Sequence, residues 1–364
     1  MKKAAVLLSF LLIMCPLFSC GGPECDIALI TMADGAESNV FSSLAWEAVS
    51  EYAEKNSLKS KYYSPLSNSQ TDIAAAVSLA AENGAKVIVF PSRFFENHVH
   101  KAQSEYPQIK FILIDGIPNN MTSEGITYDG AEYNETITEN TFAVRFNESQ
   151  AGFLTGYSLV RDGHKNLGFI GGNPDATVKR YGYGFLQGAE YAANELKLKK
   201  GTVKIKYFYT GQSKATAETQ KRAQSWFAGG TEVVFACGGT VEDSVIAAAS
   251  AAQTKVAAAD ADQSYKSSAV ITSAAKNVRQ TVYDAVSAAF SETFAGGQCV
   301  MLGAETNSIG LPLGSSRFQF FTQEEYVAVF KLLAENDKSI DIKDEKTTDI
   351  SKLGLKLITV TEEK

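Results

Sequence analysis

Short apolar runs alternate with stretches of helical periodicity along the chain after Asp26. Runs such as Val87 to Phe90 are apolar on both faces, which is typical of a buried parallel strand. Repeated strand–helix–strand units predict an α/β protein with doubly wound parallel sheets. The predicted strands are Ile27–Thr31, Lys86–Phe90, Lys110–Asp115, Phe142–Phe146, Asn166–Ile170, Val203–Tyr209, Val233–Cys237 and Val256–Asp260, and the predicted helices lie at about 40–55, 71–83, 94–105, 149–161, 178–194, 215–228 and 242–252.

The number of strands exceeds what one such sheet usually holds. With 364 residues, the chain is long enough for two domains of ordinary size. We therefore predict two sheets, with the division near residues 146–150.

The first nineteen residues have the form of a signal peptide: Lys2 and Lys3 precede an apolar run that is too short to span a bilayer. Leu17-Phe18-Ser19-Cys20 resembles a bacterial lipobox, in which the signal is cut before the cysteine and Cys20 carries lipid. Residues 20–25 would then form the lipidated cysteine and a short tether. An ordinary secretory signal is the alternative. We expect an extracytoplasmic protein anchored to the cell membrane or the outer membrane.

Composition narrows the classes of partner. The formal charge is −7 and the pI about 5.2, without a long basic run, which argues against binding nucleic acid or anionic lipid by charge. Cys25, Cys237 and Cys299 have neither zinc nor disulfide spacing, and Cys237 reads as a small buried apolar residue. His98 and His100 lack further ligands nearby, so we predict no metal and no cofactor.

Several loops at the carboxyl ends of predicted strands carry polar or aromatic residues, and ligands bind at that edge of open α/β sheets. Two aromatic rings, Phe41 and Tyr181, suit a flat ring held between them. Asp115 and Asp260 can accept hydrogen bonds from neighbouring hydroxyls, to which Lys276 can donate. For each aromatic ring the alternative is core packing, and for each aspartate a helix N-cap. Further candidates are Asp34, Ser42, Gly238 and Gly239, the glycines because they let a ligand approach the backbone.

Motifs for enzymes are weak in this sequence. Gly182, Gly184 and Gly188 miss the dinucleotide-binding spacing and fall within a predicted helix. A phosphate-binding Walker loop, a Gly-x-Ser-x-Gly elbow and a complete calcium loop are lacking. We therefore predict a binding protein, not an enzyme.

Five segments resemble the basic membrane protein family of substrate-binding lipoproteins, which includes purine nucleoside receptors of ATP-driven importers. They are Phe146-Asn147-Glu148-Ser149-Gln150-Ala151-Gly152, Gly168-Phe169-Ile170-Gly171-Gly172, Arg180-Tyr181-x-x-Gly184-Phe185-x-x-Gly188 and Asp260-Ala261-Asp262-Gln263, followed by Thr272-Ser273-x-x-Lys276. The likeness runs in order from about residue 26 to 311. Two departures stand out: Tyr181 replaces the usual Phe, and Ser38 and Ser42 flank Phe41 where the family has Asp and Asn.

This resemblance implies a type I periplasmic-binding fold, with two Rossmann-like lobes joined by three crossover strands. We expect residues 26–146 plus 270–319 in the first lobe and 147–269 plus 320–364 in the second. Bending is expected near Phe146, residues 263–269 and residues 317–320. Phe41 and Tyr181 would hold a base between them, and Asp260 and Lys276 would hold the ribose.

The function that this resemblance implies is a monomeric, lipid-anchored receptor that delivers a nucleoside, with a purine nucleoside as the first candidate, to an ABC transporter permease. A sugar receptor, or a sensor or surface adhesin that kept the fold without transport, is the alternative, and a membrane-anchored hydrolase is a third. An intact cleft favours the receptor, because an adhesin does not require one.

Overall fold

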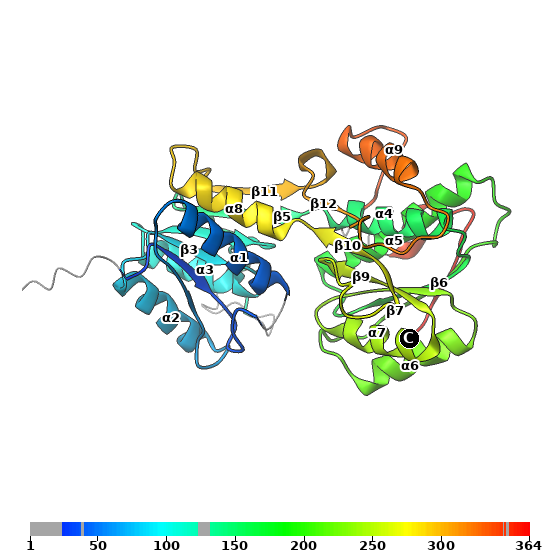
Figure 1. Ribbon diagram of the computed structural model, residues 1–364, viewed down its shortest axis with the longest axis horizontal. Helices are drawn as coiled ribbons and strands as arrows, with labels where there is room; N and C mark the ends of the chain where they lie inside the picture. The colour runs from blue at the N-terminus through cyan, green and yellow to red at the C-terminus, as the bar shows by residue number, and fades with distance from the viewer. Residues whose placement is uncertain (1–23, 38–39, 123–131, 345, 347–348) are drawn as a thin grey trace, which may run out of the picture.

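Two parallel sheets form two lobes in the computed structural model (Figure 1), which describes residues 24–37, 40–122, 132–344, 346 and 349–364. The predicted α/β architecture and its two sheets are confirmed. The first sheet is parallel throughout. The second is parallel except at one edge, where β12 pairs antiparallel with β10. The first sheet has the order β11 (Gln298–Leu302), β5 (Thr141–Phe146), β4 (Lys110–Ile114), β3 (Val87–Phe90), β1 (Ile27–Ile30) and β2 (Ser60–Tyr63); the second has β12 (Ile309–Gly310), β10 (Val270–Lys276), β9 (Lys255–Asp260), β8 (Val233–Cys237), β6 (Asn166–Gly171), β7 (Lys204–Tyr209) and β13 (Thr359–Glu362).

Helices cover both faces of each sheet. Alternate residues of β1 point to opposite faces of the first sheet and join different hydrophobic clusters. Ile27 and Leu29 pack with α1 and α8, whereas Ala28 and Ile30 pack with α2 and α3. The central strands of both lobes are therefore apolar throughout. The helices of the first lobe are α1 (Val40–Lys55), α2 (Gln70–Glu82), α3 (Glu96–Glu105) and α8 (Val278–Ala289), and those of the second are α4 (Glu148–Arg161), α5 (Ala176–Glu195), α6 (Ala217–Ala228), α7 (Val241–Ala252) and α9 (Gln323–Ala334), with short 3₁₀ turns η1 (Arg93–Phe95), η2 (Ala304–Thr306) and η3 (Ile350–Leu353).

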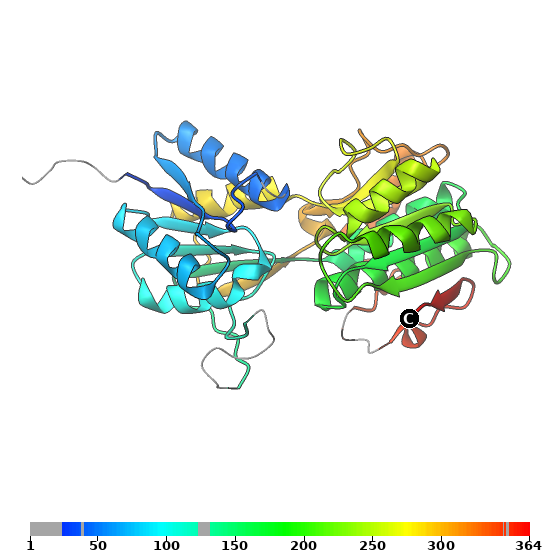
Figure 2. The same cartoon turned by 90° about the horizontal axis from the view of Figure 1, so that it is seen from below.

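The chain passes between the lobes in three places, which Figure 2 shows as thin connections. They are the β5–α4 junction, the residues between β10 and α8, and the segment between β11 and β12. The predicted boundary at residue 270 is wrong, because β10 pairs with β9 in the second sheet. The boundary at 319 is also wrong, since β12 pairs with β10.

These corrections move the expected bending points. Phe146 does lie at a crossing, but residues 263–269 form a loop within the second lobe and residues 317–320 lie against the same lobe. There the Arg317 backbone N–H donates to the Ile271 carbonyl. The missed strand β10 contains Thr272 and Ser273, which interrupt the apolar run that a buried strand would show.

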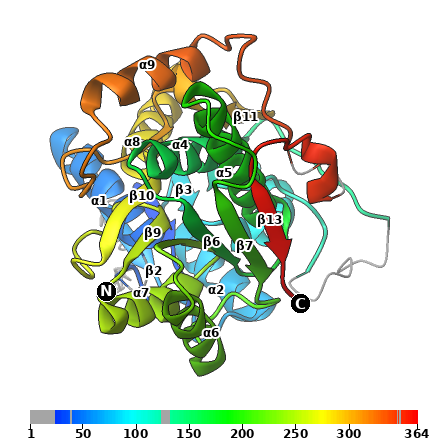
Figure 3. The same cartoon turned by 90° about the vertical axis from the view of Figure 1, so that its right-hand side faces the viewer.

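Four glycines bring α4 and α5 into close backbone contact. A Cβ atom at Gly152 or Gly156 would fall well inside van der Waals contact of carbonyl oxygens on α5, and one at Gly184 or Gly188 would do the same on α4. Of the glycines that failed the dinucleotide motif, Gly184 and Gly188 are therefore explained by helix packing, whereas Gly182 lies against the Tyr207 hydroxyl and the Phe169 ring. Figure 3 shows the two helices side by side on one face of the second sheet.

Substitution of Gly156 by Ala should therefore destabilise the protein. The added methyl group forces α4 and α5 apart, and overpacking of this kind costs about 1–3 kcal/mol, more than the gain of about 1 kcal/mol in helix propensity. We expect a lower urea midpoint than that of the unsubstituted protein. Gly314→Ala is the matched control, because a Cβ atom there meets nothing within 4 Å. Equal midpoints for the two variants would contradict this packing account.

Candidate functional site

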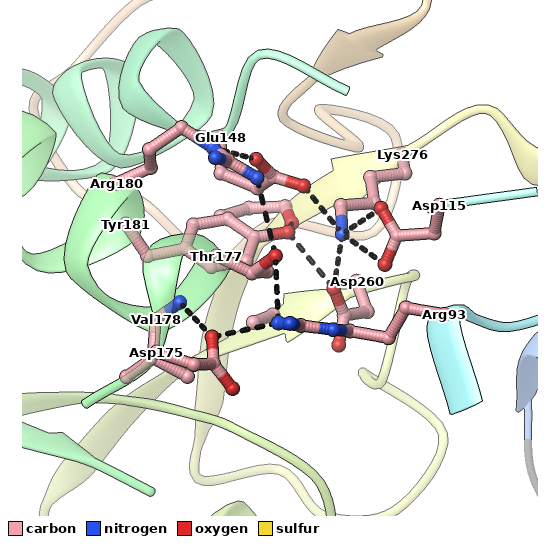
Figure 4. A network of polar contacts seen from close by, with 12 residues as sticks. Arg93, Asp115, Glu148, Asp175, Thr177, Val178, Arg180, Tyr181, Asp260 and Lys276 are labelled. Carbon is pink, nitrogen blue, oxygen red and sulfur yellow. Dashed lines mark hydrogen bonds and ion pairs between the residues drawn. The ribbon is translucent and has the colours of Figure 1, made fainter. Parts of the chain in front are cut away.

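A buried ammonium group stands at the centre of a polar cluster between the lobes (Figure 4). Lys276 ends β10, and its side chain is completely buried. Its Nζ atom lies 3.0 and 3.1 Å from the two carboxylate oxygens of Asp115, 2.9 Å from Glu148 Oε1 and 3.1 Å from Asp260 Oδ1. Asp115 follows β4 of the first lobe, whereas the other two carboxylates belong to the second. The cluster therefore connects the lobes.

Both aspartates adopt left-handed backbone conformations, with φ of 66° at Asp115 and 68° at Asp260. Aspartate tolerates this region better than most residues. Neither aspartate is the N-cap of a helix, so the alternative prediction of a capping role is wrong for both. The turns that they make direct their carboxylates to Lys276 at the strand ends.

The two aromatic rings of the predicted sandwich lie beside the same ammonium group. Lys276 Nζ is 5.3 Å from the Phe41 ring centroid and 5.4 Å from that of Tyr181, a range in which cation–π attraction acts. Phe41 comes from α1 in the first lobe and Tyr181 from α5 in the second. The Tyr181 hydroxyl donates to Asp260 Oδ1 at 3.0 Å. Tyr181 thus carries a polar contact that a phenylalanine lacks.

Two charged residues that the sequence analysis did not select complete the cluster. Glu148 is fully buried between Lys276 and Arg180, and Arg180 Nε donates to Glu148 Oε2. Both belong to segments that carry the family resemblance, but of those two segments the sequence analysis selects only Tyr181 as a site residue. Their neighbours in the sequence are polar, Ser149 beside Glu148 and Lys179 beside Arg180, so no local signal marks either residue as buried.

A second contact between the lobes lies close to this cluster (Figure 4). Arg93, the first residue of η1 after β3, forms an ion pair of 2.9 Å with Asp175, which also caps α5. Arg93 also lies 3.4 Å from Thr177 Oγ1. The sequence analysis missed all three residues because none stands out from an ordinary loop.

The remaining predicted residues are placed differently. Asp34 is exposed in a turn, and Ser42 is buried on the first turn of α1. Gly238 and Gly239 have φ of 103° and 78° and pack against the backbones of Gly172 and Ser213 respectively. Their contact with a ligand stays a prediction. Ser38, Asn39 and Cys20 lie outside the described residues, whereas Cys237 is fully buried as predicted.

Burial and neighbouring charges shift the protonation of the cluster. Burial raises the pKa of Asp115 to about 7, against the opposing effect of Lys276. Burial also opposes ionisation of Glu148, but Lys276 and Arg180 hold its pKa below the usual range. Burial disfavours charge on Lys276, yet the three carboxylates raise its pKa. The site consequently holds a charged lysine and an excess of carboxylates.

Glu242 forms a separate buried pair with Gln263 below Asp260. Gln263 Nε2 donates to Glu242 Oε1 and, at 2.8 Å, to the Ala259 carbonyl. Glu242 Oε2 and Gln263 Oε1 are buried without a hydrogen-bond partner among the described residues. Burial, together with the nearby Asp260, raises the pKa of Glu242 well above its usual range. A protonated Glu242 supplies the donor that this group of acceptors lacks.

This pair should make stability depend on pH. A carboxyl whose pKa is higher in the folded state binds its proton more tightly there, so its contribution to the unfolding free energy falls as pH rises above its unfolded pKa of about 4.5. Glu242→Gln removes that loss. We expect the stability of Glu242→Gln relative to the unsubstituted protein to increase from pH 5 to pH 8 in urea titrations. A difference that stays constant with pH would show that Glu242 is ionised in the folded protein.

Comparison with known proteins decides what kind of cleft this is. Residues 27–348 match the family model of Bmp, described as an ABC transporter substrate-binding protein, PnrA-like. The chain belongs to this family. The predicted family resemblance is confirmed, and the protein is a substrate-binding protein of an ABC transporter. The protein accordingly acts on the extracytoplasmic side of the membrane. Its partners are a small-molecule ligand and a permease.

Relatives of this Bmp-family chain are distant in sequence. It is 25% identical over 310 residues to the ABC transporter nucleoside-binding protein BmpA of Lactococcus lactis, covering 79% of this chain and 82% of that protein. It is 24% identical over 337 residues to Basic membrane protein B of Borreliella afzelii, covering 89% and 92% of the two chains.

Solved structures confirm the type I periplasmic-binding fold. An ABC transporter solute-binding protein from Conexibacter woesei superimposes with a TM-score of 0.67 at 16% identity, covering 88% of this chain and 100% of that one. One from Aeropyrum pernix gives a TM-score of 0.63 at 19% identity, covering 85% and 86%. Among the described residues, the helices are too short or too polar to cross a membrane.

Proposed function

We propose that this protein is a lipid-anchored receptor for a nucleoside, with purine nucleosides as the first candidates. The observation that carries the proposal is the position of Lys276, which pairs with Asp115 and Asp260 and lies beside both the Phe41 and Tyr181 rings from opposite lobes. Carboxylates and an ammonium group suit vicinal hydroxyls, and aromatic faces suit a flat base. The name of the Lactococcus relative, a nucleoside-binding protein, supports the same ligand class.

The charge of the cluster restricts the ligand further. Three carboxylates face Lys276 and Arg180, while Arg93 is paired with Asp175. An anionic ligand would be repelled by the carboxylate excess in a poorly solvated site. The proposal is therefore a neutral nucleoside, whose hydroxyls take the place of the contacts between these side chains, and not a nucleotide or a sugar phosphate.

Calorimetry and thermal shift of the chain begun at residue 21 test this proposal. The panel comprises inosine, guanosine, adenosine, cytidine, uridine, the free bases, ribose and inosine monophosphate. A bound nucleoside should raise the melting temperature through mass action, whereas the monophosphate should not. Binding of ribose and other sugars without nucleosides would replace the proposal by a sugar receptor. Binding by no member would favour the sensor or adhesin.

The membrane anchor is part of the proposal and rests on Leu17-Phe18-Ser19-Cys20. In bacterial expression with detergent phase separation, we expect the full-length protein in the detergent-rich phase. Cys20→Ser should move it to the aqueous phase, because the acyl chains are lost. Cys25→Ser is the matched control, since Cys25 is buried beside β1. An unchanged partition of Cys20→Ser would contradict lipidation at this residue.

A further inference from the structure

Two ion pairs join the lobes beside the cleft cluster, and they differ in burial (Figure 4). The inner pair is Lys276 with Asp115, whose side chains are 0% and 11% exposed. The outer pair is Arg93 with Asp175, whose side chains are 38% and 36% exposed. The first-lobe partners, Asp115 and Arg93, follow the neighbouring strands β4 and β3. The lobes are therefore held together at two adjacent points, one inside the cleft and one closer to solvent.

Asp175 is positioned by α5 before it meets Arg93. It is the N-cap of the helix, and its Oδ1 atom accepts from the Val178 backbone N–H at 3.1 Å. The same oxygen lies 2.9 Å from Arg93 Nη1, which also donates to Thr177 Oγ1 at 3.4 Å. The second lobe thus presents two acceptors at the start of α5, and little side-chain freedom is lost there when the lobes meet.

The two pairs respond differently when a ligand binds in the cleft. In the proposed function, which this inference extends, ribose hydroxyls take the place of the contact between Lys276 and Asp115. Arg93 and Asp175 satisfy each other and keep their contact while the ligand is held. We propose that Arg93 and Asp175 form a latch that holds the lobes closed and sets how long a ligand stays in the cleft, without touching that ligand. A ligand buried between closed lobes leaves only after they open, and opening breaks this pair.

The latch acts on opening, so its removal should raise the dissociation rate constant koff of the nucleoside. Arg93→Gln and Asp175→Asn each remove one charge of the pair, and asparagine keeps the helix cap. We expect koff to rise about two- to fivefold in each variant, the range for a partly exposed ion pair. The association rate constant kon should rise or stay unchanged, since the lobes open more readily. Surface plasmon resonance with the immobilised chain begun at residue 21 measures both constants, with each nucleoside of the panel that binds.

The double variant decides whether the two residues act as a pair. Arg93→Gln combined with Asp175→Asn should have the koff of either single variant, because the same contact is lost in all three. Every nucleoside that binds should show the same fold increase, since the latch does not touch it. Additive effects, or an increase confined to one nucleoside, would overturn the latch in favour of a direct ligand contact. An unchanged koff in the single variants would overturn it outright.

Arg279→Gln is the matched control for the loss of one positive charge. Arg279 is 44% exposed and pairs with Glu51 within the first lobe, so its substitution should leave koff unchanged. A rise equal to that of Arg93→Gln would show that the contact between the lobes is not the cause, and would overturn the latch. Melting temperatures verify that each variant is folded.

Small-angle X-ray scattering without nucleoside separates the latch from the proposed function. Lobes without the latch spend more time apart, so the double variant should have a larger radius of gyration than the unsubstituted chain and Arg279→Gln. Where a nucleoside binds, koff decides the proposal. If no nucleoside of the panel binds, the proposed function fails and the radius decides: a larger radius supports the latch, and an unchanged radius overturns it.

Discussion

Lys276→Met should lower the free energy of unfolding by about 3–5 kcal/mol, the cost of removing one partner from a buried ion pair. The methionine leaves Asp115, Glu148 and Asp260 facing each other without the ammonium group that lies 2.9–3.1 Å from them. Arg180 remains paired with Glu148, so the loss falls mainly on the two aspartates. Urea unfolding at pH 7 measures the difference.

Two further variants separate charge loss from side-chain loss. Lys331→Met on the exposed side of α9 removes a lysine that pairs with Glu335 at the surface, and such pairs contribute at most about 1 kcal/mol. Adding Asp115→Asn to Lys276→Met should restore part of the lost stability, because one unpaired buried carboxylate becomes neutral. Equal stability of Lys276→Met and Lys331→Met would refute the role of Lys276 as the central counter-ion.

Asp260→Asn should weaken nucleoside binding about 10- to 100-fold, which corresponds to the loss of a charge-assisted hydrogen bond of about 1.5–3 kcal/mol. Asparagine keeps the size of the side chain and tolerates the φ of 68° at this residue, so the change acts on charge more than on backbone shape. The proposed role of Asp260 is to bind ribose hydroxyls. Calorimetry with inosine, the nucleoside, and hypoxanthine, its free base, then shows whether Asp260 contacts the ribose or the base.

The free base provides the internal control for that result. If Asp260 binds the ribose, its substitution weakens inosine and leaves the affinity for hypoxanthine within a few-fold. Phe41→Ala should weaken both, because the proposed role of the Phe41 ring is to contact the base. Asp243→Asn is the matched control variant, since Asp243 pairs with Lys266 at the surface. An equal loss for inosine and hypoxanthine in Asp260→Asn would assign Asp260 to the base or to the fold instead.

The sequence determined the layered architecture and the first components of the cleft. Apolar runs of four to six residues located β1, β3, β4 and β8, and helical periodicity predicted α1 at its observed bounds, 40–55. These signals are strong because a strand buried on both faces is usually a continuous apolar run. Strand ends of parallel sheets face the same edge, so the sequence alone selects Asp115 and Asp260 at predicted strand ends. It selects Lys276 only as a donor to the same hydroxyls, because its strand is not predicted.

Only the tertiary structure decided which lobe each returning segment joins. β10 carries Thr272 and Ser273 within its span, and β11 is partly exposed at a sheet edge, so neither shows the apolar run that identifies a buried strand. The pairing partner of a strand depends on residues far away in sequence, which local periodicity does not contain.

The same limit applies to Glu148 and Arg180. Each is a charged residue near the start of a helix with polar neighbours in the sequence, such as Ser149 and Lys179, so nothing local predicts its burial. Their burial is tolerated only because folding brings Lys276, from more than a hundred residues away, to within 2.9 Å of Glu148. The sequence thus determined the residue types that a polar ligand requires, whereas three-dimensional proximity decided which charges neutralise one another.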